Sequence, residues 1–315
     1  MDVVAIGESM VALVNKPAGY IRHADGFKPF VAGAETNTLI GLSRLGHKTA
    51  WISALGKDEL GEFILHKVRA EQVDTASVST TGDRTGVFFK QISPDGSVDV
   101  TYYRENSAAS HMTLDDIDMD KINGAKVLYI TGITLSLSGQ TKEMLFNVVK
   151  ALNEDVKVVF DPNIRLKMWT EAEARKTILE FLPHVDYLIA GKQEVDILLG
   201  HQDFDAAMDK FRDFGCANII IKLGREGALY DMDGVRGRVD NPKQFEEIDP
   251  VGAGDAFAAG VVSGILEDRV PEGMIRTACF LGGYITQFIG DYQGFPSRGT
   301  IEAMIDADED EKVKR

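Results

Sequence analysis

Short apolar runs alternate with longer amphipathic stretches along most of the chain. Residues Val3 to Ile6 form an apolar run that ends at Gly7, which is typical of a buried strand. The same pattern predicts strands at 49–55, 126–131, 156–160, 186–190 and 218–222, and helices at 59–71, 138–152, 254–267 and 272–288. A further amphipathic helix is predicted through Leu39 and Leu45 to Gly46. Strands separated by helical crossovers predict an α/β fold with a mostly parallel central sheet and helices on both faces.

Two segments depart from this rhythm. The β-rich runs 87–92 and 98–103 flank Ser93-Pro94-Asp95-Gly96-Ser97, which predicts a hairpin. Residues 15–32 contain two prolines and two glycines and predict no regular element. We expect segments of about 11–32 and 86–104 to form a small β-sheet lid, inserted into one domain that spans residues 1–315. An edge hairpin whose aromatic residues bury one another is the alternative.

Composition narrows the class of protein. The chain has 315 residues, is 44% apolar and carries a net charge of -15. Such a chain can bury a sizeable core, and its charge argues against nucleic acid or an anionic membrane as a partner. Its two cysteines, Cys216 and Cys279, fit no zinc or redox spacing, so we expect reduced core residues and a cytoplasmic protein.

The two ends of the chain add little chemistry. The N-terminus has no basic region followed by a cleavable apolar segment, so no signal peptide is expected. No apolar run approaches the roughly 20 residues of a membrane span. The last ten residues, 306–315, are nearly all charged and predict a solvated tail.

The strongest chemical signal is the segment Asp249-Pro250-Val251-Gly252-Ala253-Gly254-Asp255, which leads into a run of small apolar residues. A glycine turn that opens a helix presents unpaired N–H groups and the positive end of the helix dipole, which favours anions. Asp255 would lie in the first helical turn, beside the expected position of a phosphate. A carboxylate next to a phosphate cradle indicates phosphoryl transfer to a hydroxyl.

Two other interpretations of this segment were weighed. An ordinary helix N-terminus, with Asp255 complementing the dipole, would be preferred for the segment taken alone. A dinucleotide fingerprint fits poorly, because Phe257 occupies its third glycine position and no buried strand precedes the turn. The chain contains no Gly-x-x-x-x-Gly-Lys-Ser/Thr motif, which excludes the usual P-loop.

The segment Asp249 to Gly260 resembles the carboxy-terminal signature of the PfkB, or ribokinase-like, sugar kinases. Residues 56–61, Gly-Lys-Asp-Glu-Leu-Gly, resemble the amino-terminal signature of the same family. The resemblance covers essentially the whole chain and implies a ribokinase-like fold. It implies that Gly252, Ala253 and Gly254 form the anion hole and that Asp255 is the catalytic base.

Family resemblance also indicates where the sugar binds. Gly33 and Asn37 match a Gly-x-x-x-Asn motif that holds sugar hydroxyls, and the lid would contribute Phe89. Residues 101–110, with Tyr102, Tyr103 and Arg104, resemble a segment of 2-keto-3-deoxygluconate kinases. The run Asp161-Pro162-Asn163-Ile164-Arg165 with Trp169 resembles a second segment of those enzymes, and Asp291 falls where they place a further substrate-binding carboxylate.

Two arginines suit an acidic sugar. The guanidinium groups of Arg104 and Arg165 are always charged, and they can bind the carboxylate of a keto acid. A salt bridge between lid and body is the alternative for Arg104, and a surface charge is the alternative for Arg165. Glu8 follows the first strand, at an edge where open α/β sheets bind ligands, although a surface acid in a loop is equally consistent.

By resemblance, ATP would lie near Asn163, Lys192, Lys222, Gly224 and Gly227, with Mg²⁺ on its phosphates. Glu194 would orient the hydration shell of the metal. The expected reaction is phosphorylation of the C6 hydroxyl of 2-keto-3-deoxygluconate, with a monovalent cation as a further candidate cofactor and a homo-oligomer as the expected assembly. A fructokinase and a non-catalytic sugar sensor on the same fold are the alternatives.

Overall fold

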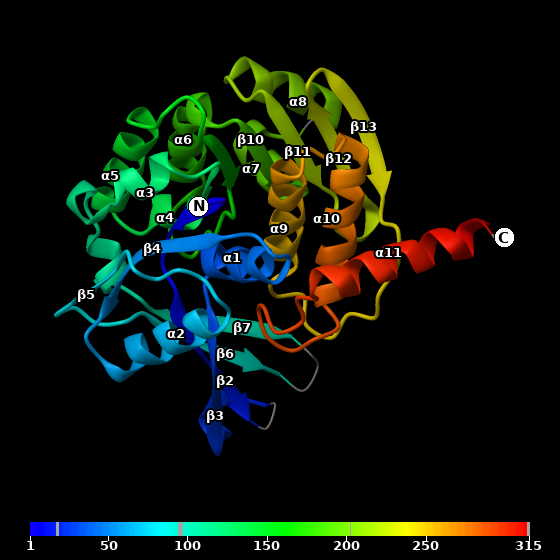
Figure 1. Cartoon of the computed structure of the whole chain (residues 1–315). Coiled ribbons are helices and arrows are strands. Elements are labelled where there is room, and N and C mark those ends of the chain that lie inside the picture. Colours follow the sequence, from blue (N-terminus) through cyan, green and yellow to red (C-terminus); the bar gives the residue numbers. More distant parts are fainter. Residues whose placement is uncertain (17–18, 94–96, 202, 314–315) are drawn as a thin grey trace.

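The structure, a computed structural model, describes residues 1–16, 19–93, 97–201 and 203–313 (Figure 1). Within these residues, a nine-stranded sheet has the strand order β13-β12-β11-β10-β9-β8-β1-β4-β5. All neighbouring strands pair in parallel except β11–β12 and β12–β13, which are antiparallel. The predicted α/β architecture is confirmed. The strands are β1 (Val3–Ile6), β4 (Thr49–Gly56), β5 (Val78–Thr81), β8 (Val127–Thr131), β9 (Lys157–Asp161), β10 (Tyr187–Gly191), β11 (Asn218–Lys222), β12 (Gly227–Met232) and β13 (Val235–Asp240).

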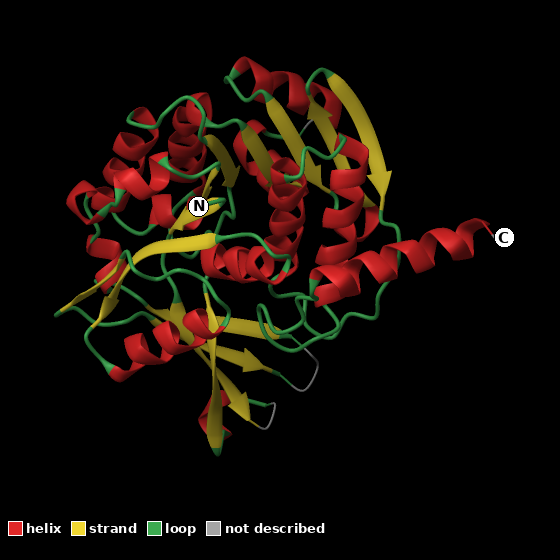
Figure 2. Ribbon diagram, viewed as in Figure 1, coloured by secondary structure: helices red, strands yellow, loops and turns green. Residues whose placement is uncertain are grey.

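Helices cover both faces of this sheet (Figure 2), and its central strands are therefore buried on both sides. Val3 and Ala5 of β1 belong to one apolar core, whereas Val4 and Ile6 belong to the other. The first core contains residues of α1 (Ala34–Arg44), α2 (Glu59–Ala70), α9 (Ala253–Leu266) and α10 (Pro271–Ile285). The second contains residues of α3 (Met119–Asn123), α4 (Gly132–Ser136), α5 (Gly139–Lys150), α6 (Glu171–Phe181), α7 (Lys192–Leu199) and α8 (Phe204–Asp213).

A small separate sheet, in the order β3-β2-β6-β7, lies below the main body in Figure 1. Its strands are β2 (Met10–Lys16), β3 (Gly26–Ala32), β6 (Val87–Ile92) and β7 (Val98–Tyr103). Strands β6 and β7 form the predicted antiparallel pair, and their turn at 94–96 lies outside the described residues.

The expectation that residues 15–32 lack regular structure was wrong for 15–16, which end β2, and for 26–32, which form β3. Pro29 pairs opposite Leu13 on β2, and β3 has no neighbour on its other side within the described sheet. An edge strand tolerates proline, because an N–H on its open side is not needed for pairing. Proline content therefore misled the prediction at this position.

The chain ends in α11 (Arg298–Val313), which extends away from the body (Figure 1). Its start is fixed by Arg298, which donates from Nε to the carbonyl of Leu45 at 2.7 Å and from Nη2 to Glu267 at 2.6 Å. The backbone continues as helix into the charged segment that was expected to be a solvated tail. Among the described residues, no helix is both long enough and apolar enough to cross a membrane.

Helices α9 and α10 pack so closely that there is no room for an added methyl group at their contact. A Cβ atom added at Gly260 of α9 would lie 2.5 Å from the Cα of Ala278 on α10. We therefore expect Gly260→Ala to lower the free energy of unfolding by about 1–3 kcal/mol, as overpacking does.

Gly273→Ala in α10 is the matched control, because its new Cβ would meet nothing closer than 3.7 Å. Helix propensity favours alanine there by up to about 1 kcal/mol. Urea unfolding of both variants measures the difference. Equal stability of the two variants would contradict the close packing of α9 on α10.

Candidate active site

The parallel strands deliver polar side chains to one edge of the main sheet. Asp161 ends β9 and Lys222 ends β11, while Glu8 follows β1. Open α/β sheets bind ligands at the carboxyl ends of their strands. A cavity of about 760 Å³ lies at this edge, and residues of the small sheet line it together with the sheet edge and the start of α9.

Backbone geometry at the start of α9 requires glycine. Gly252 is the N-cap residue, with φ +83°, and a Cβ atom there would lie 2.0 Å from the carbonyl oxygen of Asp291. Ala253 is the first helical residue. A Cβ atom built on Gly254 would lie 3.9 Å from Nζ of Lys222, so this ammonium group lies beside the turn. The N–H of Ala253 donates to the carbonyl of Pro250 at 3.3 Å. The N-terminus of α9 borders the cavity next to the positive charge of Lys222, which is an arrangement that favours anions.

Asp255 lies in the first turn of α9 and is only 8% exposed. Its Oδ2 accepts a 2.8 Å hydrogen bond from Nδ2 of Asn37, which is 2% exposed and belongs to α1. Burial raises the pKa of Asp255 to about 7, with Asp161 and Asp291 adding to the rise and with Asn37 and Arg165 opposing it. Such a carboxyl group can accept a proton near neutral pH.

Asp291 follows α10 and borders the same cavity as Asp255. Burial raises the pKa of Asp291 to about 6, and Asp249 adds to the rise, while Lys90, Asn37 and Arg165 oppose it. The other amide atom of Asn37, Oδ1, is buried and has no hydrogen-bond partner among the described residues. Buried polar atoms are rarely left unpaired, so this oxygen is available to a ligand hydroxyl.

A cation and two acids lie together at the strand ends beside the turn. Lys222 donates from Nζ to Oδ2 of Asp161 at 2.7 Å, and the backbone N–H of Asn163 donates to the other oxygen of Asp161. Glu194 accepts hydrogen bonds from the N–H groups of Gly191 and Ile164, and burial raises its pKa. Lys192 opens α7 and lines the cavity nearby.

The two arginines singled out in the sequence have different surroundings. Arg104 is buried and donates from Nε to Glu8 at 2.7 Å, so its charge is already neutralised within the protein. Glu8 also accepts a hydrogen bond from Ser107, and the reading of Glu8 as a surface acid was therefore wrong. Arg165 lines the cavity, is exposed, and forms no ion pair with any residue that the structure describes.

Strand alternation corrects two predicted lid residues. Phe88 and Tyr102 line the cavity, whereas Phe89 and Tyr103 do not. The rings of Phe89 and Tyr103 contact each other on the opposite face of the sheet, where Tyr103 is 62% exposed. Successive residues of a strand point to opposite faces, so adjacent positions could not all face the sugar side.

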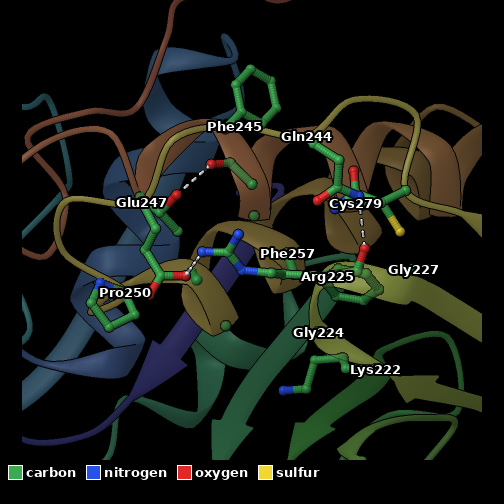
Figure 3. Close-up of a pocket in the computed structure, with 16 residues that line it drawn as sticks. Lys222, Gly224, Arg225, Gly227, Gln244, Phe245, Glu247, Pro250, Phe257 and Cys279 are labelled. Atoms are coloured by element: carbon green, nitrogen blue, oxygen red, sulfur yellow. Dashed lines mark hydrogen bonds and ion pairs between the residues drawn. The ribbon is translucent and has the colours of Figure 1, made fainter.

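A second cavity, of about 270 Å³, adjoins the first at Lys222, Gly224, Pro250 and Gly254 (Figure 3). Its walls include Phe245, Phe257, Cys279 and Gly283, and Gly227 lies at its rim. Arg225 and Glu247 form a 3.0 Å ion pair at its border. An apolar pocket that opens onto a phosphate cradle has the shape and chemistry to take a nucleoside base.

The structure therefore gathers most predicted residues around two joined cavities. Gly33, Asn37, Tyr102, Arg104, Asn163, Arg165, Lys192, Glu194, Gly252, Asp255 and Asp291 line the first, while Ala253 and Gly227 line the second and Lys222, Gly224 and Gly254 line both. Sequence reasoning missed Phe88 and Lys90, which the period of two in β6 would have placed on one face with Tyr102. It also missed the second cavity, whose apolar residues give no signal distinct from that of core residues.

Comparison with known proteins gives the family. A model of the pfkB family carbohydrate kinases matches residues 1–298. The chain belongs to this family. The kinase is 33% identical over 311 residues to a 2-dehydro-3-deoxygluconokinase of Bacillus subtilis (strain 168), covering 98% of this chain and 96% of the relative. It is 34% identical over 312 residues to the protein of that name from Thermoproteus tenax, covering 98% and 95%.

Other similar proteins show how far the family extends. A probable fructokinase of Arabidopsis thaliana is 27% identical over 315 residues, covering 96% of each chain. The crystal structure of a PfkB protein from Polaromonas sp. JS666 superposes with a TM-score of 0.88 at 34% identity, covering 96% of this kinase and 99% of that chain. The ribokinase-like fold is thus established for the kinase.

The environment of Asp255 predicts its titration. We expect carbon-13 NMR of the aspartate carboxyl groups to report a pKa of about 7 for Asp255. Asn37→Ala should raise that pKa further, because the lost hydrogen bond stabilises the charged form. Asn153→Ala, outside the cavity, should leave it unchanged. A wild-type pKa near the ordinary aspartate value of about 4 would contradict the burial of this group.

Proposed function

We propose that this kinase transfers the γ-phosphoryl group of ATP to the C6 hydroxyl of 2-keto-3-deoxygluconate, the sugar also called 2-dehydro-3-deoxygluconate. One observation carries the proposal. A buried carboxyl group with a pKa near neutrality lies in the first turn of the helix whose N-terminus forms the anion cradle. Similarity to two 2-dehydro-3-deoxygluconokinases at 33% and 34% identity supports the choice of sugar.

Asp255 is the base in this proposal. Asn37 holds one oxygen of Asp255, which leaves the other free to take the proton of the sugar hydroxyl. The backbone N–H groups at Gly252, Ala253 and Gly254 stabilise the charge that develops on the transferring phosphoryl group. The positive charge of Lys222 adds to this stabilisation. Burial lowers the pKa of Lys222, but Asp161 and Glu194 raise it by more, so the side chain stays protonated.

The nucleotide base occupies the apolar second cavity, and the phosphates extend past Gly224 toward Lys222. Among the described residues, no group of three or more acidic, histidine or cysteine side chains could hold a metal ion. The carboxyl group of Glu194, which lines the cavity, suits Mg²⁺, because this ion keeps several waters and binds mainly through substrate phosphates. Glu194 would face the hydrated ion, which supplies charge neutralisation when bound.

Recognition of an acidic sugar falls to Arg165. Arg165 and Lys192 are both exposed cations of the cavity without an ion-pair partner among the described residues, and of the two only Arg165 has a planar fork that matches a carboxylate. Tyr102 and the unpaired Oδ1 of Asn37 can bind oxygen atoms of the sugar, and Asp291 can accept hydrogen bonds from its hydroxyls. Gly33, at the start of α1, also borders this space.

One observation favours a neutral sugar such as fructose. Arg104 is paired with Glu8, so of the two arginines only Arg165 is left to bind a carboxylate. Fructokinase relatives are less similar than the two 2-dehydro-3-deoxygluconokinases, which places this function second. The homo-oligomer, the monovalent cation and the cytoplasmic location stay predictions from the sequence.

Replacing the base tests the chemistry. Asp255→Asn keeps the shape of the side chain but cannot accept the proton, so kcat should fall by at least about 10²-fold. The KM for the sugar should change little, because the amide still fills the same space. Steady-state kinetics measure both constants, and turnover within a few-fold of wild type would leave Asp255 as a helix-capping residue only.

Replacing Arg165 tests the choice of sugar. A charge-assisted hydrogen bond contributes about 1.5–3 kcal/mol, so Arg165→Leu should raise the KM for 2-keto-3-deoxygluconate by at least about tenfold. Activity on fructose should be unchanged or improved, which makes fructose the internal control for folding. Equal losses on both sugars would contradict the role of Arg165, and a wild-type preference for fructose would contradict the acidic sugar.

A further inference from the structure

Lid strand β6 places one charged side chain inside the molecule. Lys90 shares the cavity face of β6 with Phe88, and its Nζ donates to Oδ2 of Asp249 at 2.8 Å. The two side chains are only 5% and 6% exposed. The ion pair therefore joins the small sheet to the segment immediately before the anion cradle, across 159 residues of sequence.

Asp249 connects this ammonium group to the backbone of the site. Its Oδ1 accepts a hydrogen bond from the N–H of Val251, one residue before Gly252, and its Oδ2 accepts one from the N–H of Gly290. Gly290 precedes Asp291, whose carbonyl oxygen leaves no room for a side chain at Gly252. One carboxylate thus holds the lid, the cradle and the loop that carries Asp291.

Burial makes a purely stabilising role a poor explanation of this pair. Removing two charges from water is costly, and a well-packed apolar pair of similar volume often stabilises a protein equally well. A charged pair offers something that an apolar pair does not. Its energy depends strongly on whether the two groups are in contact in a dry environment, so it distinguishes a seated lid from a displaced one.

We propose that Lys90 and Asp249 are positioning residues that couple the seating of the small sheet to the geometry of the anion cradle. When the sheet is seated, the ammonium of Lys90 neutralises Asp249, and Asp249 holds Val251 and Gly290 at hydrogen-bond distance. When the sheet moves away, Asp249 loses its counter-ion beside Asp291 and an incoming triphosphate. Only the seated state therefore has both the small sheet and the anion cradle in the arrangement needed for phosphoryl transfer. This inference rests on the proposed kinase function.

Lys90→Met tests the coupling, because methionine keeps an unbranched side chain of similar reach without the charge. We expect kcat, at saturating sugar and ATP, to fall at least about tenfold, since a misplacement of about 1 Å costs up to about 10²-fold. The KM for the sugar should stay within about threefold, because the pair is not proposed to bind the sugar. Lys90→Arg, which retains the charge, should recover part of the lost turnover.

Lys167→Met is the matched control. Lys167 also ties the small sheet to the body, through a 3.0 Å ion pair with Asp99 of β7, but in this pair the two side chains are 59% and 67% exposed. We expect its kcat to remain at the wild-type value. A structural role alone for Lys90 would lower the unfolding temperature of Lys90→Met while leaving kcat within about twofold of wild type, and that result would overturn the proposal.

A double variant covers the case in which Lys90→Met does not fold. Lys90→Met/Asp249→Asn removes both charges of the pair, so neither partner is left as an unpaired buried charge that could prevent folding. The proposal predicts a folded protein with low kcat, and wild-type turnover would refute it. Wild-type enzyme and Asp255→Asn run in parallel separate the two claims. An inactive wild type contradicts the kinase function, whereas an active wild type with unaffected Lys90 variants contradicts only the coupling.

Discussion

The hydrogen bond from Asn37 to Asp255 joins two helices at the centre of the site, across 218 residues of sequence. Helix α1 follows the small-sheet strand β3, and α9 follows the glycine turn, so their packing brings the sugar side and the phosphate side together. Asp255 is buried where a carboxylate would normally be costly. The amide of Asn37 and the N-terminus of α9 keep that group able to ionise, and neighbouring acids keep its pKa near neutrality.

Charge balance in the cavity separates structural groups from reacting ones. Three acids each contact a cation, in the pairs Glu8–Arg104, Asp161–Lys222 and Asp249–Lys90. In the described structure Asp255, Asp291 and Arg165 remain without such a partner, and all three line the cavity. An acidic protein can therefore bind an anionic sugar beside two carboxylates, because three neighbouring acids are neutralised internally and one guanidinium group is free.

The sequence predicted the framework well, because hydrophobic periodicity reports burial directly. Strands β1, β8, β9, β10 and β11 fall where apolar runs occur, and the glycine turn predicted the start of α9. Strand β3 was missed, because Pro29 suggests a break although an edge position tolerates it. Phe89 and Tyr103 were assigned to the wrong face of the small sheet. The family resemblance identified the segments that contain the lining residues, whereas strand alternation determines which residues of those segments face the cavity.

Contacts between distant segments could not be read from the sequence. The residues near Arg104 in the sequence do not indicate that Glu8 neutralises its charge. Likewise, the residues near Lys90 do not indicate that its ammonium group pairs with Asp249. Likewise, Phe245 and Cys279 resemble core residues until the fold places them around an open pocket. Tertiary structure thus changed which charged groups are free to bind substrate, while Gly252 and Asp255 lie at the start of α9, where the motif placed them.

The most direct test of the central claim is the consumption of ATP by the purified enzyme with each of three sugars: 2-keto-3-deoxygluconate, fructose and ribose. The account predicts the highest kcat/KM with the keto acid, by at least about tenfold over fructose, which corresponds to roughly 1.4 kcal/mol of differential transition-state binding. The product should carry its phosphate at C6. A preference for fructose or ribose, or the absence of ATP consumption with the keto acid, would contradict the assignment.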